Sequence, residues 1–339
     1  MRRSAITLGA VVALGLVAGV LLSSLLIAPS TPPKPPPSAG AVVTPTPRAS
    51  SAATGAPTTV PTDSPPAPSP TTAPTLGQRI GQRLIVAMAG TTPTAELLGR
   101  ARRGEIGGVI LFRRNVTTPD ALRRAIDSLQ QAAHDGGQPP LLIMADQEGG
   151  SIRTIPWAPP ALSAHAMGTH PTTWIKAKGA ATGKALAAVG VNVDLAPVAD
   201  VPASTSTFMA LAGRAFSTHA SRAAADVSSF AAGLRSAGVI AVGKHAPGIG
   251  RVARNTDQVA QTVTASKAAL ETDLAPFRAL IKNRIPMLML SNATYPAYDA
   301  SNAAGWSRAI SVDLLRGTLG FKGVTITDSL DGTGTARRV

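Results

Sequence analysis

The sequence predicts an α/β fold, specifically a TIM-like (β/α)8 barrel that is incomplete, with about seven βα units. Beyond residue 76, short apolar runs alternate with longer amphipathic stretches, which is the pattern of a parallel sheet with helices outside it. Five predicted strands end in polar or ionisable side chains, and barrel strands place such groups at their active face. This convergence favours a barrel over an open doubly wound sheet. The strand ends are Asp146, Asp200, Lys244-His245, Ser291-Asn292 and Asp328.

The predicted strands are seven short apolar runs, and the predicted helices fall between them. One helix is expected to start at Thr118-Pro119-Asp120, where Thr118 can cap the helix and Pro119 suits its first position. The other expected helices cover residues 172–188, 222–236, 267–282 and 312–319. The expected strands cover residues 83–89, 106–112, 141–146, 192–198, 239–244, 287–291 and 324–328.

The first region, residues 1–28, is predicted to be a signal-anchor or a signal peptide. Arg2 and Arg3 precede an uncharged apolar run over residues 5–28, which is long enough to cross a hydrocarbon core of roughly 30 Å. Pro29 disfavours cleavage directly after Ala28, but both alternatives predict export. The protein would lie on the outer face of the cytoplasmic membrane or be secreted into the cell envelope. Because the chain has no cysteine, a lipidated cysteine anchor is excluded.

Residues 29–75 are almost entirely Pro, Thr, Ala and Ser and are predicted to form a disordered linker. Such a segment buries too little apolar surface to offset its ordering entropy, and its prolines favour extended conformations. We expect it to act as a stalk that holds the third region, residues 76–339, away from the membrane.

Composition excludes several classes of partner. The net charge of +14 is consistent either with simple solubility or with attraction to anionic envelope polymers. Nucleic acid is not expected, because aromatic residues make up only 3% of the chain and no nucleic-acid motif is present. The five histidines show no metal-ligand spacing, and no phosphate-binding Gly-rich loop or Gly-x-Ser-x-Gly elbow occurs. Neither a metal nor another cofactor is expected.

Three predicted loops could together form a polar pocket for a hydroxyl-rich ligand. Asp146 and Glu148 follow one buried strand, and Lys244-His245 ends another. Each group also has a simpler interpretation: an acidic loop that caps the next helix, solvated charges at a rim, or, for Arg214, a surface arginine. Together they offer acceptors and cationic donors suited to sugar hydroxyls.

Six motifs give the chain a specific resemblance over roughly residues 76–330. They are Gly107-Gly108-Val109-Ile110-Leu111-Phe112, Ala145-Asp146-Gln147-Glu148-Gly149-Gly150, Ala196-Pro197-Val198-Ala199-Asp200, Gly213-Arg214-Ala215-Phe216, Gly243-Lys244-His245-Ala246-Pro247-Gly248 and Leu319-Gly320-Phe321-Lys322-Gly323-Val324. In order and spacing this set resembles the glycoside hydrolase family 3 N-terminal domain, above all the single-domain β-N-acetylglucosaminidases of the peptidoglycan-recycling type.

The resemblance implies a TIM-like barrel and a two-step mechanism that retains anomeric configuration. It places Asp328, after the seventh strand, as the nucleophile that forms a glycosyl-enzyme ester. The residues that it implies for binding the sugar are Asp146, Arg214, Lys244 and His245.

The chain departs from the family pattern at the general acid/base. Where the N-acetylglucosaminidases carry an Asp-x-His dyad, this chain has Asn255 and Asp257, and Ile249 replaces a nearby motif histidine. Asp257 is therefore the remaining candidate acid/base. We expect Arg251 and Arg254 to lower its pKa, which would weaken it as an acid. Loss of general acid/base help costs about 10²–10⁴-fold in rate.

The region 76–339 is predicted to be truncated after strand seven. Family members continue past the nucleophile through an eighth strand, whereas this sequence reaches Val339 eleven residues after Asp328. Three explanations fit: a truncated or frameshifted reading frame, a domain completed by another chain, or a degenerate fold with another role.

Two main functions remain for the sequence. The first is retaining removal of terminal β-linked N-acetylglucosamine from cell-wall glycans or muropeptides, with an activity that the missing histidine and eighth strand would impair. The second is a non-catalytic glycan-binding protein on the same fold, which the missing histidine favours. An unstable fragment without function is a third, weaker alternative.

Overall fold

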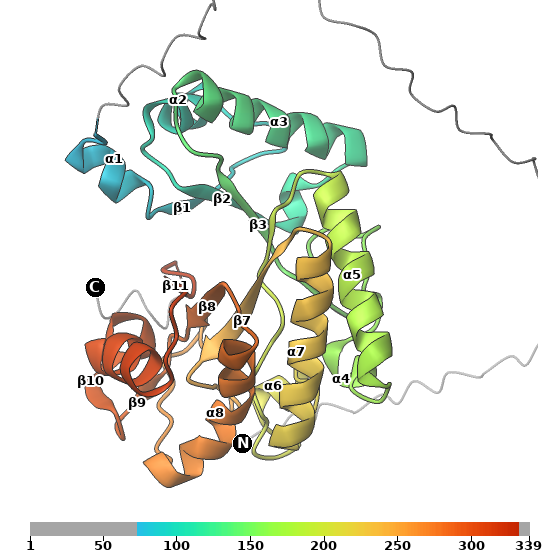
Figure 1. Ribbon diagram of the computed structural model, residues 1–339, viewed down its shortest axis with the longest axis vertical. Coiled ribbons are helices and arrows are strands. Elements are labelled where there is room, and N and C mark those ends of the chain that lie inside the picture. The colour runs from blue at the N-terminus through green and yellow to red at the C-terminus, as the bar shows by residue number, and fades with distance from the viewer. Residues whose placement is uncertain (1–72, 332–339) are drawn as a thin grey trace, which may run out of the picture. The chain divides into compact units, whose positions relative to one another are not determined.

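The computed structural model describes residues 73–331, and these form a curled, seven-stranded parallel sheet with helices outside it (Figure 1). The sheet order is β1-β2-β3-β6-β7-β8-β11, so each sheet strand lies beside the next one along the chain. Within residues 73–331, β1 and β11 each pair with one neighbour, so the sheet curls without closing. The seven predicted strands are confirmed: β1 Ile85–Ala87, β2 Gly108–Leu111, β3 Leu142–Ala145, β6 Val193–Asp194, β7 Ile240–Ala246, β8 Met287–Leu290 and β11 Val324–Thr327.

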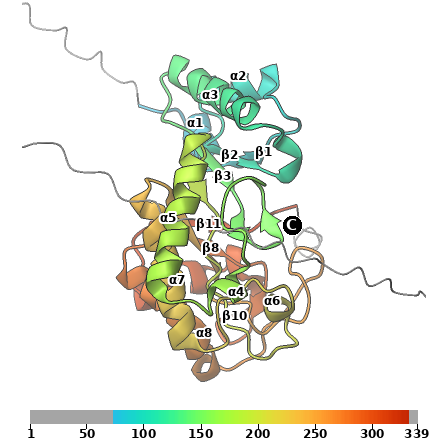
Figure 2. The same cartoon turned by 90° about the vertical axis from the view of Figure 1, so that its right-hand side faces the viewer.

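The helices pack on the outside of the sheet, and Figure 2 shows α5 and α7 side by side. α7 also packs against α8, and α2 packs against α3 beside β1 and β2. The predicted cap is confirmed, because the Thr118 hydroxyl accepts a hydrogen bond of 3.2 Å from the Ala121 amide. The helices are α1 Leu76–Gly81, α2 Ala95–Arg103, α3 Pro119–Asp135, α4 Ala164–Met167, α5 Thr172–Ala188, α6 Phe208–Leu211, α7 Ala220–Ser236 and α8 Lys267–Lys282.

The last expected helix, residues 312–319, overlaps a π-helical segment, Ala309–Thr318, that starts three residues earlier and precedes β11. Two short hairpins complete the described structure. One consists of β4 Gln147–Gly149 and β5 Ile152–Arg153, directly after β3, and the other of β9 Thr294–Tyr295 and β10 Asp299–Ala303.

The sheet has an apolar layer on each face, as expected for parallel strands that are buried on both sides. Ile143 belongs to the large core between sheet and helices, whereas its neighbour Met144 belongs to a smaller cluster on the other face. Side chains alternate between faces along a strand, so neighbouring residues of one strand, such as Ile143 and Met144, belong to different layers. The smaller cluster consists of Met144, Val193, Leu195, Val242, Met287 and Met289.

The long connection between β7 and α8 approaches the loop after β6 very closely. A Cβ atom added to Gly250 would lie 1.9 Å from the Val201 carbonyl oxygen, so this contact requires glycine. The Ala203 amide also donates a hydrogen bond of 2.9 Å to the Gly250 carbonyl. This connection, residues 247–266, is thereby held above the carboxyl ends of the strands.

The predicted membrane segment, residues 1–28, and nearly all of the predicted linker, residues 29–75, lie outside the described residues. Among residues 73–331, no helix has the length and apolar character needed to cross a membrane.

Candidate active site

Lys244, near the end of β7, is buried with only 2% of its surface exposed, and two carboxylates surround its ammonium group. Its Nζ atom lies 2.5 Å from Asp146 Oδ1 and 2.7 Å from Glu148 Oε1. Burial by itself lowers the pKa of Lys244, but the charges of Asp146 and Glu148 outweigh burial and raise that pKa above its ordinary value. Lys244 therefore stays charged and joins the end of β7 to the turn after β3.

Glu148 links this lysine to Arg214. The Arg214 guanidinium donates two hydrogen bonds to the Glu148 carboxylate, of 2.8 Å from Nε and 2.7 Å from Nη2. Burial alone would raise the pKa of Glu148, but Lys244 and Arg214 lower it to about 2. Glu148 is therefore ionised, and it holds Arg214 in a fork geometry that a lysine could not provide.

His245 lies next to Lys244 on β7 and is held by a buried carboxylate. Its Nδ1 atom is 2.7 Å from Asp200 Oδ2, while Asp200 Oδ1 accepts a hydrogen bond of 2.8 Å from the Ile249 amide. Because the carboxylate accepts, Nδ1 carries the proton, and Nε2 is the ring nitrogen left for a ligand.

Asp328 follows β11 directly. Its amide donates to the Leu290 carbonyl at 2.9 Å, which extends the pairing with β8 up to this residue. Its Oδ1 atom accepts a hydrogen bond of 2.8 Å from the Ser329 amide, and the side chain is half-buried. The carboxylate is thus held at the strand end yet reachable.

Asp257 lies in the connection between β7 and α8, and its pKa is raised. Burial is the largest cause, and the negative charge of Asp328 is the second. His245, Arg214 and Lys244 act in the opposite direction. Asp257 therefore feels the charges of four of the other predicted site residues, which indicates that the group converges on one place.

The expectation that Arg251 and Arg254 lower the pKa of Asp257 is wrong. Arg251 instead pairs with Asp273 of α8, with Nε 2.7 Å from Oδ2, and Arg254 is exposed to solvent. These two arginines are close to Asp257 in sequence, but their charges are directed to another carboxylate or to water.

Asp194, at the end of β6, is a fully buried carboxyl group below this charge network. Its Oδ1 atom accepts a hydrogen bond of 3.1 Å from the Gln147 amide, and its buried Oδ2 atom has no hydrogen-bond partner. Burial raises the pKa of Asp194 well above its ordinary value, and Asp146 and Glu148 contribute further. Asp194 thus keeps its proton at a pH where an exposed aspartate has lost it.

Sequence reasoning missed the roles of Glu148, Asp194 and Asp200. Glu148 and Asp200 follow predicted strands, so position alone could have indicated them, whereas Asp194 lies inside a predicted strand. Their roles depend on which charged side chain each one contacts. His245, the partner of Asp200, is 45 residues away in the sequence, and Arg214 and Lys244, the partners of Glu148, are 66 and 96 residues away.

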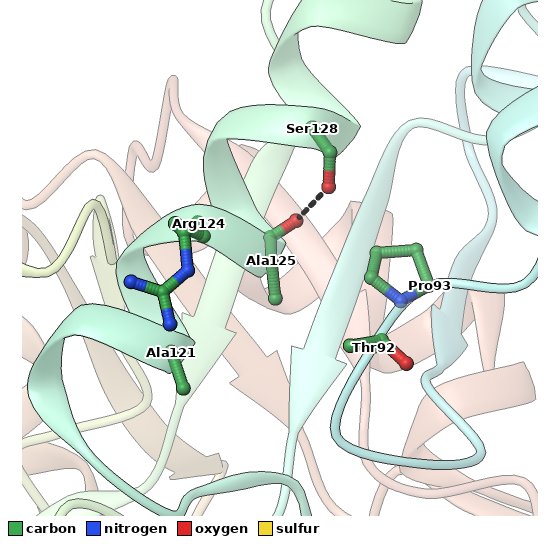
Figure 3. Close-up of a pocket in the computed structure, with 6 residues that line it drawn as sticks. All are labelled: Thr92, Pro93, Ala121, Arg124, Ala125 and Ser128. Carbon is green, nitrogen blue, oxygen red and sulfur yellow. Dashed lines mark hydrogen bonds between the residues drawn. The ribbon is translucent and has the colours of Figure 1, made fainter.

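Figure 3 shows a separate cavity of about 300 Å³ between α3 and the loop after β1. Arg124 is the only ionisable side chain among its six lining residues, and none of the predicted site residues lines it. The cavity therefore adds nothing to the charged group at the strand ends.

A curled parallel sheet with charged side chains at the carboxyl ends of its strands is the arrangement of α/β-barrel enzymes. The chain belongs to glycosyl hydrolase family 3, because the family model described as "Glycosyl hydrolase family 3 N terminal domain" matches residues 75–338. It is β-N-acetylhexosaminidase-like within that family.

Relatives by sequence support this assignment. A β-hexosaminidase from Alkalilimnicola ehrlichii is 34% identical over 264 residues, covering 73% of this chain and 72% of the relative. A protein from Arthroderma benhamiae described as an uncharacterized secreted glycosyl hydrolase is 35% identical over 248 residues, covering 71% and 70% of the two chains.

Solved structures agree. A β-N-acetylhexosaminidase from Beutenbergia cavernae superposes with a TM-score of 0.72 at 33% identity, covering 78% of this chain and 80% of the other. A family 3 β-N-acetylglucosaminidase from a Paenibacillus species gives a TM-score of 0.75 at 28% identity. That superposition covers 78% of this chain but only 51% of the other, longer protein.

Replacing Asp194 by asparagine should change how stability depends on pH. The folded-state pKa of Asp194 is raised, so wild-type stability falls as pH rises from about 4, the ordinary aspartate pKa, to the folded-state pKa, by about 1.4 kcal/mol per pH unit. Asp194→Asn removes this loss and keeps the acceptor for the Gln147 amide. Urea unfolding across a pH series should show that the free energy of unfolding of the variant rises relative to that of wild type as pH rises. A constant difference between the two proteins at all pH values would contradict the raised pKa of Asp194.

Proposed function

We propose that the protein removes terminal β-linked N-acetylglucosamine from glycans with retention of anomeric configuration. The observation that carries this proposal is the electrostatic coupling of Asp257 to Asp328, next to Arg214, Lys244 and His245. Most retaining glycosidases use two carboxyl groups with opposite protonation states near one sugar carbon. The names of the relatives, β-hexosaminidase and β-N-acetylglucosaminidase, support the choice of sugar.

In the first step, the ionised Asp328 attacks the anomeric carbon and forms an ester while the bond to the leaving oxygen breaks. Protonated Asp257 gives its proton to that oxygen, and its raised pKa makes this possible at higher pH than for an ordinary aspartate. In the second step, ionised Asp257 takes a proton from water as the water oxygen attacks the same carbon. Asp328 leaves as a carboxylate, so two inversions give net retention.

The remaining residues hold the sugar. The Asp146 side chain is 27% exposed, and Lys244 contacts its Oδ1 atom, so Oδ2 is available to accept from a sugar hydroxyl. Arg214 and Nε2 of His245 complete the pocket with directed polar groups. In this arrangement Lys244 acts chiefly on the protein, because it positions Asp146 and Glu148.

We place the substrate in the cell envelope. The predicted signal-anchor or signal peptide and the predicted stalk support export, and one relative is described as secreted. Cell-wall glycans or muropeptides would then be within reach of the domain, and its positive charge would favour anionic envelope polymers.

A second candidate is glycan binding without hydrolysis on the same residues. The Asn255–Asp257 pair favours it, because the Asn255 side chain accepts from the Asp257 amide at 3.0 Å and forms a local turn in place of an Asp-x-His dyad. Calorimetry with N-acetylglucosamine oligomers that shows heat of binding without product would support this alternative.

Asp328→Asn should reduce hydrolysis of an aryl β-N-acetylglucosaminide by at least about 10³-fold, because an amide cannot act as the nucleophile. Release of the chromophore measures the rate. Asp331→Asn, an exposed acid in the same loop, is the matched control and should retain wild-type activity. Equal rates for Asp328→Asn and wild type would overturn the proposed mechanism.

Asp257→Asn should affect substrates according to their leaving group. Hydrolysis of chitobiose, whose leaving alcohol needs a proton, should fall by about 10²–10⁴-fold. An activated aryl substrate should still form the ester, so a burst of chromophore should precede slow turnover. Added azide should restore turnover and give a β-glycosyl azide.

The pH profile gives an independent readout of the same residue. A general acid must be protonated, so wild-type activity should fall as pH rises through the raised pKa of Asp257, and Asp257→Asn should lose this alkaline limb. Arg254→Gln, an exposed change in the same connection, should keep the wild-type profile. An unchanged alkaline limb in Asp257→Asn would exclude Asp257 as the acid.

A further inference from the structure

A second cavity, of about 330 Å³, contains two tryptophans and two cations and is called the tryptophan pocket below. Its lining residues are Arg153, Trp157, Ala158, Pro159, Pro160, Ala161, Leu162, Trp174 and Lys178. They come from β5, from the loop that follows it and from α5. None of them belongs to the six residues proposed for hydrolysis. Its volume lies at the lower end of the range for small-molecule sites.

The loop that carries Trp157 is held in place by Gln147, the residue between Asp146 and Glu148. The buried Gln147 side chain donates to the carbonyls of Ile155 at 3.0 Å and Ala158 at 2.9 Å, and its Oε1 atom accepts from the Ile155 amide at 3.0 Å. The pocket is therefore formed before any ligand arrives, and its wall is attached to the turn that carries two of the site carboxylates.

The pocket has positive charge with no balancing carboxylate. Within residues 73–331, neither Arg153 nor Lys178 takes part in an ion pair, and no acidic residue is among the residues that line the pocket. Arg153 uses its Nη2 atom for the carbonyls of Pro156 and Ala158, while its buried Nε atom has no hydrogen-bond partner. An anionic group on a ligand would supply the missing charge and an acceptor.

The two indole rings differ in what they offer. Trp174 is already engaged, because Lys178 Nζ lies 4.7 Å from its ring centroid and His170 stacks on it at 4.0 Å. Trp157 is 39% exposed, and the neighbouring Leu162 is exposed as well. An exposed indole beside an aliphatic side chain provides a flat apolar surface with a polar edge, which suits the C–H face of a pyranose ring.

We propose that the tryptophan pocket binds a sugar unit that carries a carboxylate. The pyranose packs on Trp157 and Leu162, and Arg153 and Lys178 bind the carboxylate. The proposal rests on the proposed function only in taking the ligand to be a glycan. An acidic unit of the glycan held here would be recognised separately from the N-acetylglucosamine at the strand ends.

Fluorescence titration can follow this pocket alone. The chain has three tryptophans, so Trp306→Phe leaves Trp157 and Trp174 as the only indole emitters. The probes are N-acetylmuramic acid and N-acetylglucosamine, which differ by one carboxylate-bearing lactyl group. We expect a saturable change with N-acetylmuramic acid and at least about tenfold weaker binding of N-acetylglucosamine. The preference should shrink as salt is added.

Charge variants in the same background test the cations. Lys178→Gln should weaken binding of N-acetylmuramic acid about five- to tenfold, whereas Lys176→Gln, an exposed change on the same helix, should leave the Kd unchanged. Equal Kd values for the two sugars, equal effects of the two lysine variants, or no saturable change with either sugar would overturn the proposal.

Aryl glycoside hydrolysis separates this outcome from failure of the proposed function. Lys178→Gln should keep wild-type hydrolysis while losing the preference of the pocket for N-acetylmuramic acid over N-acetylglucosamine. Asp328→Asn should lose hydrolysis while keeping the fluorescence titration. The two proposals can therefore fail independently.

Discussion

The buried ammonium group of Lys244 is the charge around which the active site is organised. An unpaired charge at 2% exposure would cost several kcal/mol, so the end of β7 can be occupied by lysine only if carboxylates meet it there. Asp146 and Glu148 do so from the turn after β3, at 2.5 and 2.7 Å. Glu148 then holds Arg214 through two further hydrogen bonds. One electrostatic requirement thus positions three chain segments against one another.

The same charges act on the two carboxyl groups proposed for the chemistry. Asp328 stands at the end of β11, and its negative charge, together with burial, raises the pKa of Asp257. The cations of the pocket oppose that rise, so the acid strength of Asp257 depends on a balance between Asp328 and the residues that hold the sugar. A carboxyl group can replace histidine as the acid only when its surroundings hold the proton in this way. The residues proposed to bind the sugar therefore also influence the pKa of the proposed acid.

Local sequence patterns were enough to predict all seven strands and the start of α3, because strand runs and helix caps are set by neighbouring residues. They also indicated which strand ends carry polar groups. The pKa of Asp257 was predicted in the wrong direction, because Arg251 is near in sequence but pairs with Asp273 in space. Glu148 was placed in the predicted polar pocket, but its pairing with Arg214 and Lys244 was missed because those partners lie on other segments. Which charge meets which depends on tertiary packing, and no local pattern records it.

In the proposed mechanism, Asp328 forms a covalent ester with the sugar while Asp257 supplies and removes the proton. The most direct measurement is the intact mass of Asp257→Asn after rapid acid quenching during turnover of an activated aryl β-N-acetylglucosaminide, followed by peptide mapping. The mechanism predicts that this variant accumulates the ester, seen as a mass gain of one N-acetylhexosaminyl unit on the peptide that contains Asp328. Chromophore release without any adduct, or an adduct on a different residue, would contradict it.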